Sequence, residues 1–219
     1  MFRKNLVPTV IVSVIAATFF SAAVLFAKQV EHVSQTQATC GVEINLRVVR
    51  LLPEKWEFEL SARNSSSEAV FITTAPIRSN GSKGGYFALD PKEPATLNIG
   101  VQLYQPPDYS IYSNQTRVTL KRLEPGATHV EEIVLSFPAK ETSPPYQGLE
   151  YETLDKGKIR GVRATIGILP DDEGIRDFLR RKQGIGPYAG GIELIQRGSL
   201  NGKSLYEVQQ IIRTPLLML

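Results

Sequence analysis

The stretch WEFELSAR, residues 56–63, is the clearest indication of the fold class, because its apolar and polar residues alternate without a break. Trp56, Phe58, Leu60 and Ala62 occupy every second position, and charged or polar residues lie between them. Successive side chains of a β-strand point to opposite faces, so a period of two predicts a strand with one buried face. Segments on both sides of this strand have the same period.

Similar apolar stripes predict about eight or nine short strands in total. Besides 56–63, the stripes lie at 42–51, 70–74, 97–103, 116–123, 131–137, 162–168, 192–195 and 205–213. In the first of these, the apolar positions pass from Val48 to Val49, which predicts a β-bulge that leaves Val49 and Leu51 in the apolar set. The turn EPGA, residues 124–127, lies between two stripes and predicts a hairpin.

The gaps between the stripes are turns or irregular loops rather than helices, so parallel strands are not expected. The sequence therefore predicts an all-β fold, an antiparallel β-sandwich within one domain over residues 40–215. From Val42 to Arg213 this pattern resembles a generic immunoglobulin-like sandwich, without the Cys-Trp-Cys signature of antibody domains. The resemblance is to a fold class and implies no activity.

One segment, residues 171–184, has the period of a short helix instead. Acidic residues begin it, basic residues follow, and Gly184 comes after them, which is the order that a helix dipole and a helix end favour. Its apolar face consists of Ile175, Phe178 and Leu179. We expect this helix to cover one open end of the sandwich.

The amino terminus directs the chain to a membrane. Residues 6–27 carry no charge, and Arg3 and Lys4 precede them. At about 1.5 Å per residue this helix could cross a hydrocarbon core about 30 Å thick. Residues 1–28 are therefore a signal-anchor with a cytoplasmic amino end and the domain outside, or a signal peptide whose cleavage leaves the domain secreted or periplasmic.

Residues 29–39 are expected to form a polar linker, and residues 216–219 a short tail.

The remaining composition excludes several classes of protein. The net charge is +3, and two of the basic residues belong to the amino-terminal segment, so we expect no nucleic-acid partner. A single cysteine, Cys40, excludes an intrachain disulfide and leaves either an unpaired thiol or a bridge to a partner. No cofactor or metal is expected.

Few residues suggest catalysis. Asp171, Asp172 and Glu173 could form a glycosidase-type pair or bind a cation, but acids at a helix start are explained by capping. His129 is predicted to be an exposed turn residue, since no Gly-x-Ser-x-Gly motif accompanies it. The paired acids at 57 and 59 and at 131–132 are interpreted as solvated strand faces.

A tyrosine-rich loop between two predicted strands is the strongest candidate for recognition. Tyr104, Tyr109 and Tyr112 lie there with two prolines. Tyrosine and proline provide rigid contact area at low entropic cost, which suits binding. Three Asn-x-Ser/Thr sequons also fall in predicted turns or loops, at Asn64, Asn80 and Asn114.

The sequence thus favours a membrane-anchored or secreted, non-enzymatic β-sandwich that binds a protein or an envelope component. Two alternatives stay open. One is a carboxylate-dependent hydrolase that uses the acids at 171–173. The other is a subunit that joins a larger envelope complex through an exposed sheet edge.

Overall fold

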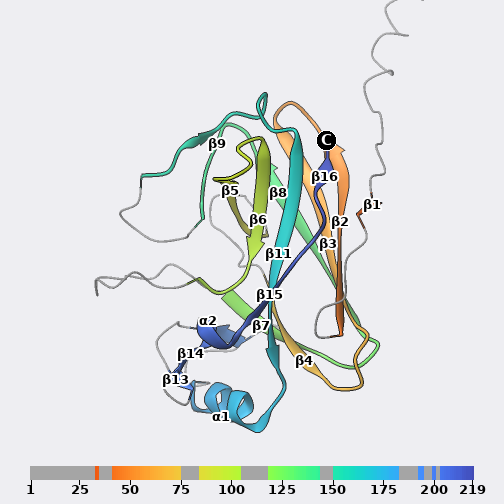
Figure 1. Cartoon of the computed structure of the whole chain (residues 1–219), viewed down its shortest axis with the longest axis vertical. Coiled ribbons are helices and arrows are strands. Elements are labelled where there is room, and N and C mark those ends of the chain that lie inside the picture. Colours follow the sequence, from red (N-terminus) through yellow and green to blue (C-terminus); the bar gives the residue numbers. More distant parts are fainter. Residues whose placement is uncertain are drawn as a thin grey trace, which may run out of the picture. The chain divides into compact units, whose positions relative to one another are not determined.

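A computed structural model describes eight parts of the chain. They are residues 33–34, 41–74, 84–104, 118–143, 150–182, 192–194, 199–200 and 203–219. All of them belong to one compact unit, Glu31–Leu219. Within these residues the chain is mostly β, with several sheets and two helices (Figure 1).

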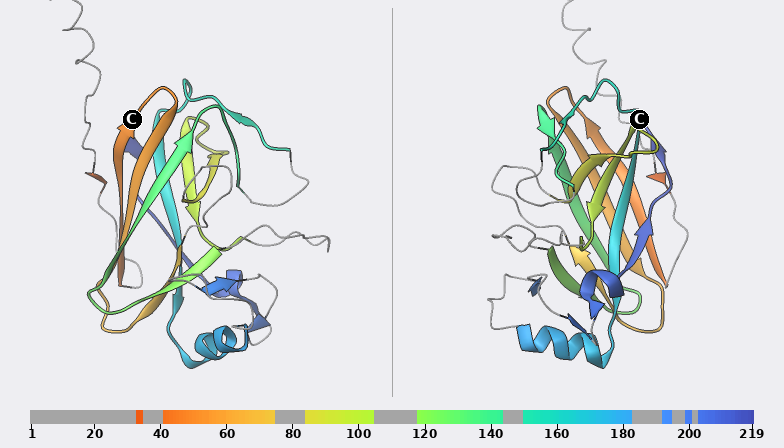
Figure 2. Two further views of the ribbon diagram at one scale, coloured as in Figure 1. Left: turned by 180° about the vertical axis from the view of Figure 1, so that it is seen from behind. Right: turned by 60° about the vertical axis from the view of Figure 1, so that its left-hand side comes forward.

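Two large sheets account for most of the strands (Figures 1 and 2). The four-stranded sheet has the order β1 (Val33–Ser34), β2 (Val42–Leu51), β3 (Lys55–Asn64), β8 (Thr128–Ser136). The eight-stranded sheet contains β12 (Ile192–Leu194), β7 (Val118–Leu123), β4 (Val70–Thr74), β11 (Gly161–Pro170), β6 (Thr96–Val101) and β5 (Tyr86–Leu89), with β15 (Gln210–Arg213) and β16 (Leu217–Met218) on β11.

The smaller elements lie between these strands. Two short antiparallel pairs are β9 (Ala139–Lys140) with β10 (Thr153–Leu154) and β13 (Ser199–Leu200) with β14 (Lys203–Ser204). The helices are α1 (Glu173–Lys182) and α2 (Leu205–Val208).

The strand at 56–63 is confirmed, since β3 buries alternate residues along its length. The bulge in β2 is also confirmed by a register shift between Val48 and Arg50. The side chains after it are not core residues, however, because Val49 and Leu51 are 36% and 38% exposed. Val49 is the extra residue of the bulge and has no partner on β3, and Leu51 is the last residue of the strand.

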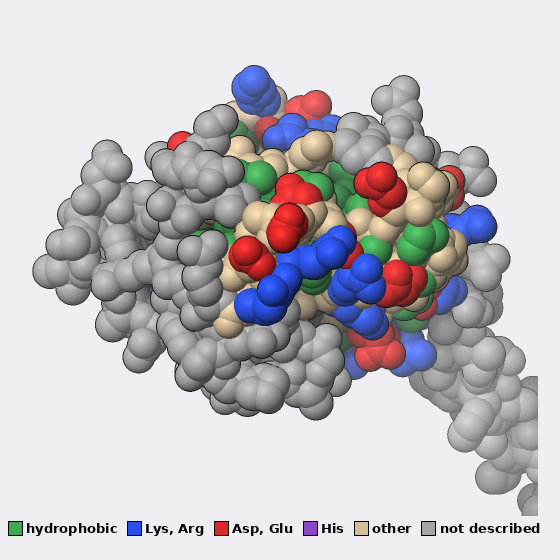
Figure 3. All heavy atoms as spheres, turned by 90° about the horizontal axis from the view of Figure 1, so that it is seen from below, with side chains coloured by type: hydrophobic (Ala, Val, Ile, Leu, Met, Phe, Trp, Pro, Cys, Tyr) green, Lys and Arg blue, Asp and Glu red, His purple; other side chains and the backbone are tan. Residues whose placement is uncertain are grey.

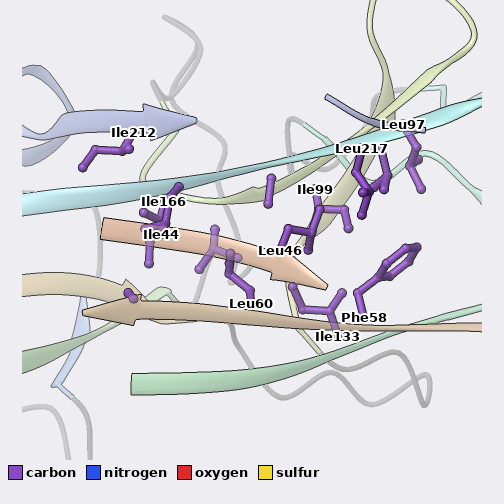
Figure 4. Close-up of a cluster of buried hydrophobic side chains, with 14 of the residues drawn as sticks. Ile44, Leu46, Phe58, Leu60, Leu97, Ile99, Ile133, Ile166, Ile212 and Leu217 are labelled. Atoms are coloured by element: carbon purple, nitrogen blue, oxygen red, sulfur yellow. The ribbon is translucent and has the colours of Figure 1, made fainter. Parts of the chain in front are cut away.

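One hydrophobic core contains side chains from both large sheets (Figure 4). The labelled residues come from the four-stranded sheet (Ile44, Leu46, Phe58, Leu60, Ile133) and from the eight-stranded sheet (Leu97, Ile99, Ile166, Ile212, Leu217), and the two sets point toward one another. Burial of apolar surface on this scale is the main term that stabilises a domain.

The prediction of purely antiparallel pairing is wrong. β6 and β11 pair in parallel, from Thr96 with Gly161 to Val101 with Ile166, so the eight-stranded sheet is mixed. No helix is needed to connect them, because the chain between them passes through β7, β8, β9 and β10, partly in the other sheet. Alternation predicts which face of a strand is buried, but it carries no information about the partner strand.

The hairpin predicted around residues 124–127 is also wrong. β7 pairs with β4 and β12, whereas β8 pairs with β3, so the turn carries the chain from one large sheet to the other. Gly126 has a φ of +76°, a conformation that glycine adopts without strain, and Ala127 N donates to Glu124 O at 3.0 Å. The sequence therefore predicts the tight turn at 124–127 correctly, but not that its two flanking strands belong to different sheets.

The short helix predicted within 171–184 is confirmed as α1, and its apolar face packs on a second apolar cluster. Phe71, Tyr86 and Leu120 of this cluster alternate along their strands with residues of the first core, so they occupy the other face of the eight-stranded sheet. Because both faces are covered here, β4 is buried at all five positions.

The single strand predicted at 205–213 is instead a turn of helix followed by a strand, α2 and then β15. Gln209 N donates to Leu205 O at 2.9 Å, which closes the helical turn before β15 begins. In the part of the chain that the structure describes, neither helix is long and apolar enough to cross a bilayer. The predicted segment at 6–27 and most of the 29–39 linker lie outside the described residues.

Candidate functional site

Of the three tyrosines predicted to bind a partner, the structure describes Tyr104, which follows β6. Its ring packs against Tyr86 in an edge-to-face contact, with centroids 5.3 Å apart. Its hydroxyl lies over Gly100, where a Cβ atom would be only 1.9 Å away. Gly100 therefore leaves room for a half-buried aromatic ring at the start of the loop. Tyr109 and Tyr112 lie outside the described residues.

A buried polar junction supports the sheet beneath Tyr104. The β4–β11 ladder reaches Ile72 and the β6–β11 ladder reaches Val101. Just beyond them, the hydroxyl of Thr73 accepts from Gly167 N at 2.8 Å and lies 2.5 Å from Val101 O. One side chain thus satisfies backbone groups that the ladders leave unpaired, as buried polar groups require.

Gln209 holds the next residue of the same segment. Its Oε1 accepts from Leu103 N at 3.0 Å, and its Nε2 donates to Leu103 O at 2.6 Å. The amide side chain thus pairs with Leu103 as a neighbouring strand would. The backbone immediately before Tyr104 is held by two hydrogen bonds, so the tyrosine loop begins from a fixed position.

The acids predicted for a hydrolase have structural partners. Asp171, whose side chain is 2% exposed, accepts from Arg122 Nε at 2.6 Å and from Arg176 Nε at 2.7 Å. Burial opposes ionisation, but these two hydrogen bonds outweigh it, and the pKa of Asp171 is lowered. A general acid requires the opposite shift.

Asp172 caps α1, because its Oδ1 accepts from Ile175 N at 2.8 Å. Glu173 lies in the first turn of the same helix. Among the described side chains on the face seen from below, acidic and basic groups are mixed (Figure 3). Among the described residues, no group of His, Cys, Asp and Glu side chains is arranged to hold a metal ion.

A set of inward-facing polar residues lies where β7 and β8 face each other from the two sheets. We call it the inter-sheet polar cluster; it comprises Thr74, Thr119, Lys121, His129 and Glu131. In β8, His129 pairs with Ala62 and Glu131 pairs with Leu60, both of them core residues, so these polar side chains share the inner face. Lys121 pairs with the core residue Ile72, and Thr119 pairs with Thr74.

Three charged or titratable groups of the cluster form a chain of contacts. Lys121 Nζ lies 3.0 Å from His129 Nδ1, and His129 Nε2 lies 3.0 Å from Glu131 Oε1. The side chains of His129 and Glu131 are 16% and 12% exposed. The predictions that His129 is exposed and that Glu131 lies on a solvated face are therefore wrong. At 57 and 59, by contrast, the acids form cross-strand ion pairs with Arg50 and Arg47.

Sequence reasoning missed this cluster, although a signal was present. His129 and Glu131 are in phase with the buried Ile133 of the same strand, and Lys121 is in phase with Leu123. Polar residues that continue an apolar stripe point inward at positions where a core residue would otherwise stand. Polarity alone suggests exposure at these positions, whereas their phase relative to Ile133 and Leu123 places them on the inner face.

The sequon at Asn64 also has a structural role. The side chain is 0% exposed, and its Nδ2 donates to Glu68 O at 2.8 Å and to Leu123 O at 3.0 Å. The atom that would carry a glycan is therefore engaged twice inside the protein. Three other residues considered above lie outside the described residues: Cys40, Asn80 and Asn114.

Known proteins offer no guide to this arrangement. No protein-family model, no curated protein and no solved structure matches the chain significantly.

Proposed function

We propose that this protein is a non-enzymatic binding module of the cell envelope or the extracellular space. Residues 6–27 would hold it at a membrane, or their cleavage would release it. An immunoglobulin-like β-sandwich would present the loop of Tyr104, Tyr109 and Tyr112 to a protein or envelope partner. The core shared by the two large sheets supports the sandwich, although the parallel pair β6–β11 departs from the simplest version of it.

The packing of the Tyr104 side chain is the observation that carries this proposal. The ring contacts Tyr86, the hydroxyl lies over Gly100, and Gln209 holds the preceding residue by both backbone groups. A loop that leaves a sheet from a fixed aromatic base loses less conformational entropy when it binds. In this arrangement Tyr104 positions the loop, and Tyr109 and Tyr112 make the contacts with the partner.

Site-specific crosslinking tests the proposed surface. A photoreactive amino acid is placed at position 109 or 112 of the full-length chain in its native membrane, and, as a control, at Val130, which is 51% exposed on β8. We expect one discrete adduct from positions 109 and 112 and none from position 130. Equal labelling from all three positions, or no adduct from the loop, would contradict the proposal.

The location is tested separately by the amino-terminal sequence of the mature protein. If the chain begins at Met1 and fractionates with membranes, residues 6–27 act as an anchor. If it begins near Val24 or Lys28, a signal peptide has been removed and the domain is released. Either result supports export, whereas recovery of the intact chain from the soluble cytoplasm contradicts it.

Edge-strand assembly is a second candidate, favoured by the pairing of β1 with β2. Val33 pairs with Arg47 and Ser34 with Leu46, so the outer edge of β2 accepts an added antiparallel strand. Among the described residues this edge has no other strand beside it. A crosslinker at Glu43 of β2 that captures a partner, while one at position 109 does not, would favour this function.

A carboxylate-dependent hydrolase has less support. The pairing of Asp171 with two arginines and the capping role of Asp172 explain both acids without catalysis. The lowered pKa of Asp171 also disfavours proton donation near neutral pH.

A further inference from the structure

The contact between Lys121 and His129 requires a neutral imidazole. An ammonium group only donates hydrogen bonds, so Nδ1 of His129 must accept from Lys121. A carboxylate only accepts, so Nε2 of His129 must donate its proton to Glu131. The two partners thus define one tautomer, with the proton on Nε2.

Adding a proton to this imidazole breaks one contact and keeps the other. The new N–H at Nδ1 would face the ammonium of Lys121, so two donors and two positive charges would meet 3.0 Å apart. The contact from Nε2 to Glu131 would remain and would become an ion pair. Lys121 therefore has to leave its position, whereas His129 and Glu131 can stay together.

The displaced contact is one that joins the two large sheets. Lys121 belongs to β7 in the eight-stranded sheet, and His129 belongs to β8 in the four-stranded sheet. The neighbours on the same inner faces are uncharged, since β3 contributes Leu60 and Ala62 and β4 contributes Ile72. Among the described residues on these faces, Lys121 and Glu131 are thus the charged groups that His129 faces.

We propose that Lys121, His129 and Glu131 form a proton-sensitive clasp between β7 and β8. Near neutral pH the clasp is closed, because neutral His129 accepts from Lys121 and donates to Glu131. On acidification His129 takes up a proton, Lys121 withdraws, and this edge between the sheets opens to solvent. Histidine suits such a role because its ordinary charge change lies between about pH 5 and pH 8. The clasp does not depend on the proposed binding function.

The test uses His129→Gln as a non-titrating replacement. A glutamine amide can accept from Lys121 through its oxygen and donate to Glu131 through its nitrogen at any pH in this range. Hydrogen exchange of the full chain is measured by mass spectrometry near pH 7.5 and near pH 5, corrected for intrinsic exchange rates. Peptides covering β7 and the start of β8 report on the clasp, and peptides covering β6 and β11 serve as an internal control.

In the wild-type chain we expect protection of β7 to fall about tenfold on acidification, the loss that one net hydrogen bond corresponds to. In His129→Gln it should change by less than about twofold. Lys121→Met provides a second variant, because it removes the opposing donor, and acidification should then leave β7 protection unchanged or increase it. An equal loss in the wild type and both variants, or no loss in the wild type, overturns the proposal.

Discussion

Replacing Asn64 by alanine should destabilise the domain, because this last residue of β3 is a fully buried polar side chain with several partners. The side chain makes four hydrogen bonds: two donated by Nδ2 to Glu68 O and Leu123 O, and two accepted by Oδ1 from Ser66 N and Ser66 Oγ. The backbone of Asn64 is also bonded to the turn at 124–127, where Gly126 N donates to its carbonyl at 2.7 Å. Two of the places where the chain crosses between the large sheets, β3 to β4 and β7 to β8, therefore meet at this residue.

The expected loss follows from where the partners lie. The bond to Leu123 O is buried, so its removal leaves an acceptor that water cannot reach, at a cost of about 1–3 kcal/mol. The bonds to Glu68 O and Ser66 are only partly buried, and water can replace them at a cost of about 0.5–1.5 kcal/mol in total. We expect a free energy of unfolding lower by about 2–4 kcal/mol, or about 4–16 °C in Tm.

Urea unfolding followed by tryptophan fluorescence measures this loss. Trp56 is the only tryptophan of the chain and is buried on the same strand as Asn64, so its emission reports on unfolding of β3. Asn64→Asp retains the acceptor and loses both donors, and it should be at least as destabilising as alanine. Ser65→Ala is the matched control in the same turn, since it removes one exposed bond to Gly41 O.

A change below about 0.5 kcal/mol for Asn64→Ala, or a change equal to that of Ser65→Ala, would refute the reasoning. A lower m-value without a shifted midpoint would also count against it, because it would indicate an altered denatured state rather than a lost native contact.

Three further predictions follow from the same contacts. Asp171→Asn should lower the free energy of unfolding by about 1–3 kcal/mol at neutral pH. Because the pKa of Asp171 is lowered in the folded state, its contribution to stability is present above the unfolded pKa of about 3.9 and is lost as pH falls through the folded value. The urea midpoints of wild type and variant should therefore converge in acid. Gly100→Ala should displace the Tyr104 ring, cost about 1–3 kcal/mol and reduce crosslinking from position 109. Expressed in a glycosylating host, the folded protein should carry no glycan at Asn64, as peptide mass spectrometry would show.

The sequence predicted strand faces well where burial determines them. Alternation at Trp56 to Ala62 identified the buried face of β3, and the apolar stripe at 70–74 identified the strand β4. The capping signals of α1 were equally direct, because Asp172 and the apolar face act locally along the chain. These features depend on residues close together in sequence.

Strand partners could not be predicted in the same way. The turn at Gly126 is compatible with a hairpin and with a crossing between sheets. In the structure it is a crossing, and it is hydrogen-bonded to Asn64, which is distant in sequence. The parallel pair β6–β11 likewise leaves no local pattern. At the candidate site, the loop that begins at Tyr104 could be recognised from its composition. The contact of the Tyr104 hydroxyl with Gly100 could not, because it depends on how the chain after β6 folds back over that strand.

The inter-sheet polar cluster and Asn64 together indicate how this domain specifies its topology. Apolar packing between the sheets is non-directional, so it would tolerate several ways of connecting them. Hydrogen bonds are directional, and they occur at two of the places where the chain leaves one sheet for the other: Asn64 joins the β3–β4 and β7–β8 crossings, and Lys121 and His129 flank the β7–β8 crossing. Substitutions in the apolar core should therefore lower stability while preserving strand order. Simultaneous loss of Asn64 and of the Lys121–His129 contact should instead weaken the placement of β7 and β8 in two different sheets.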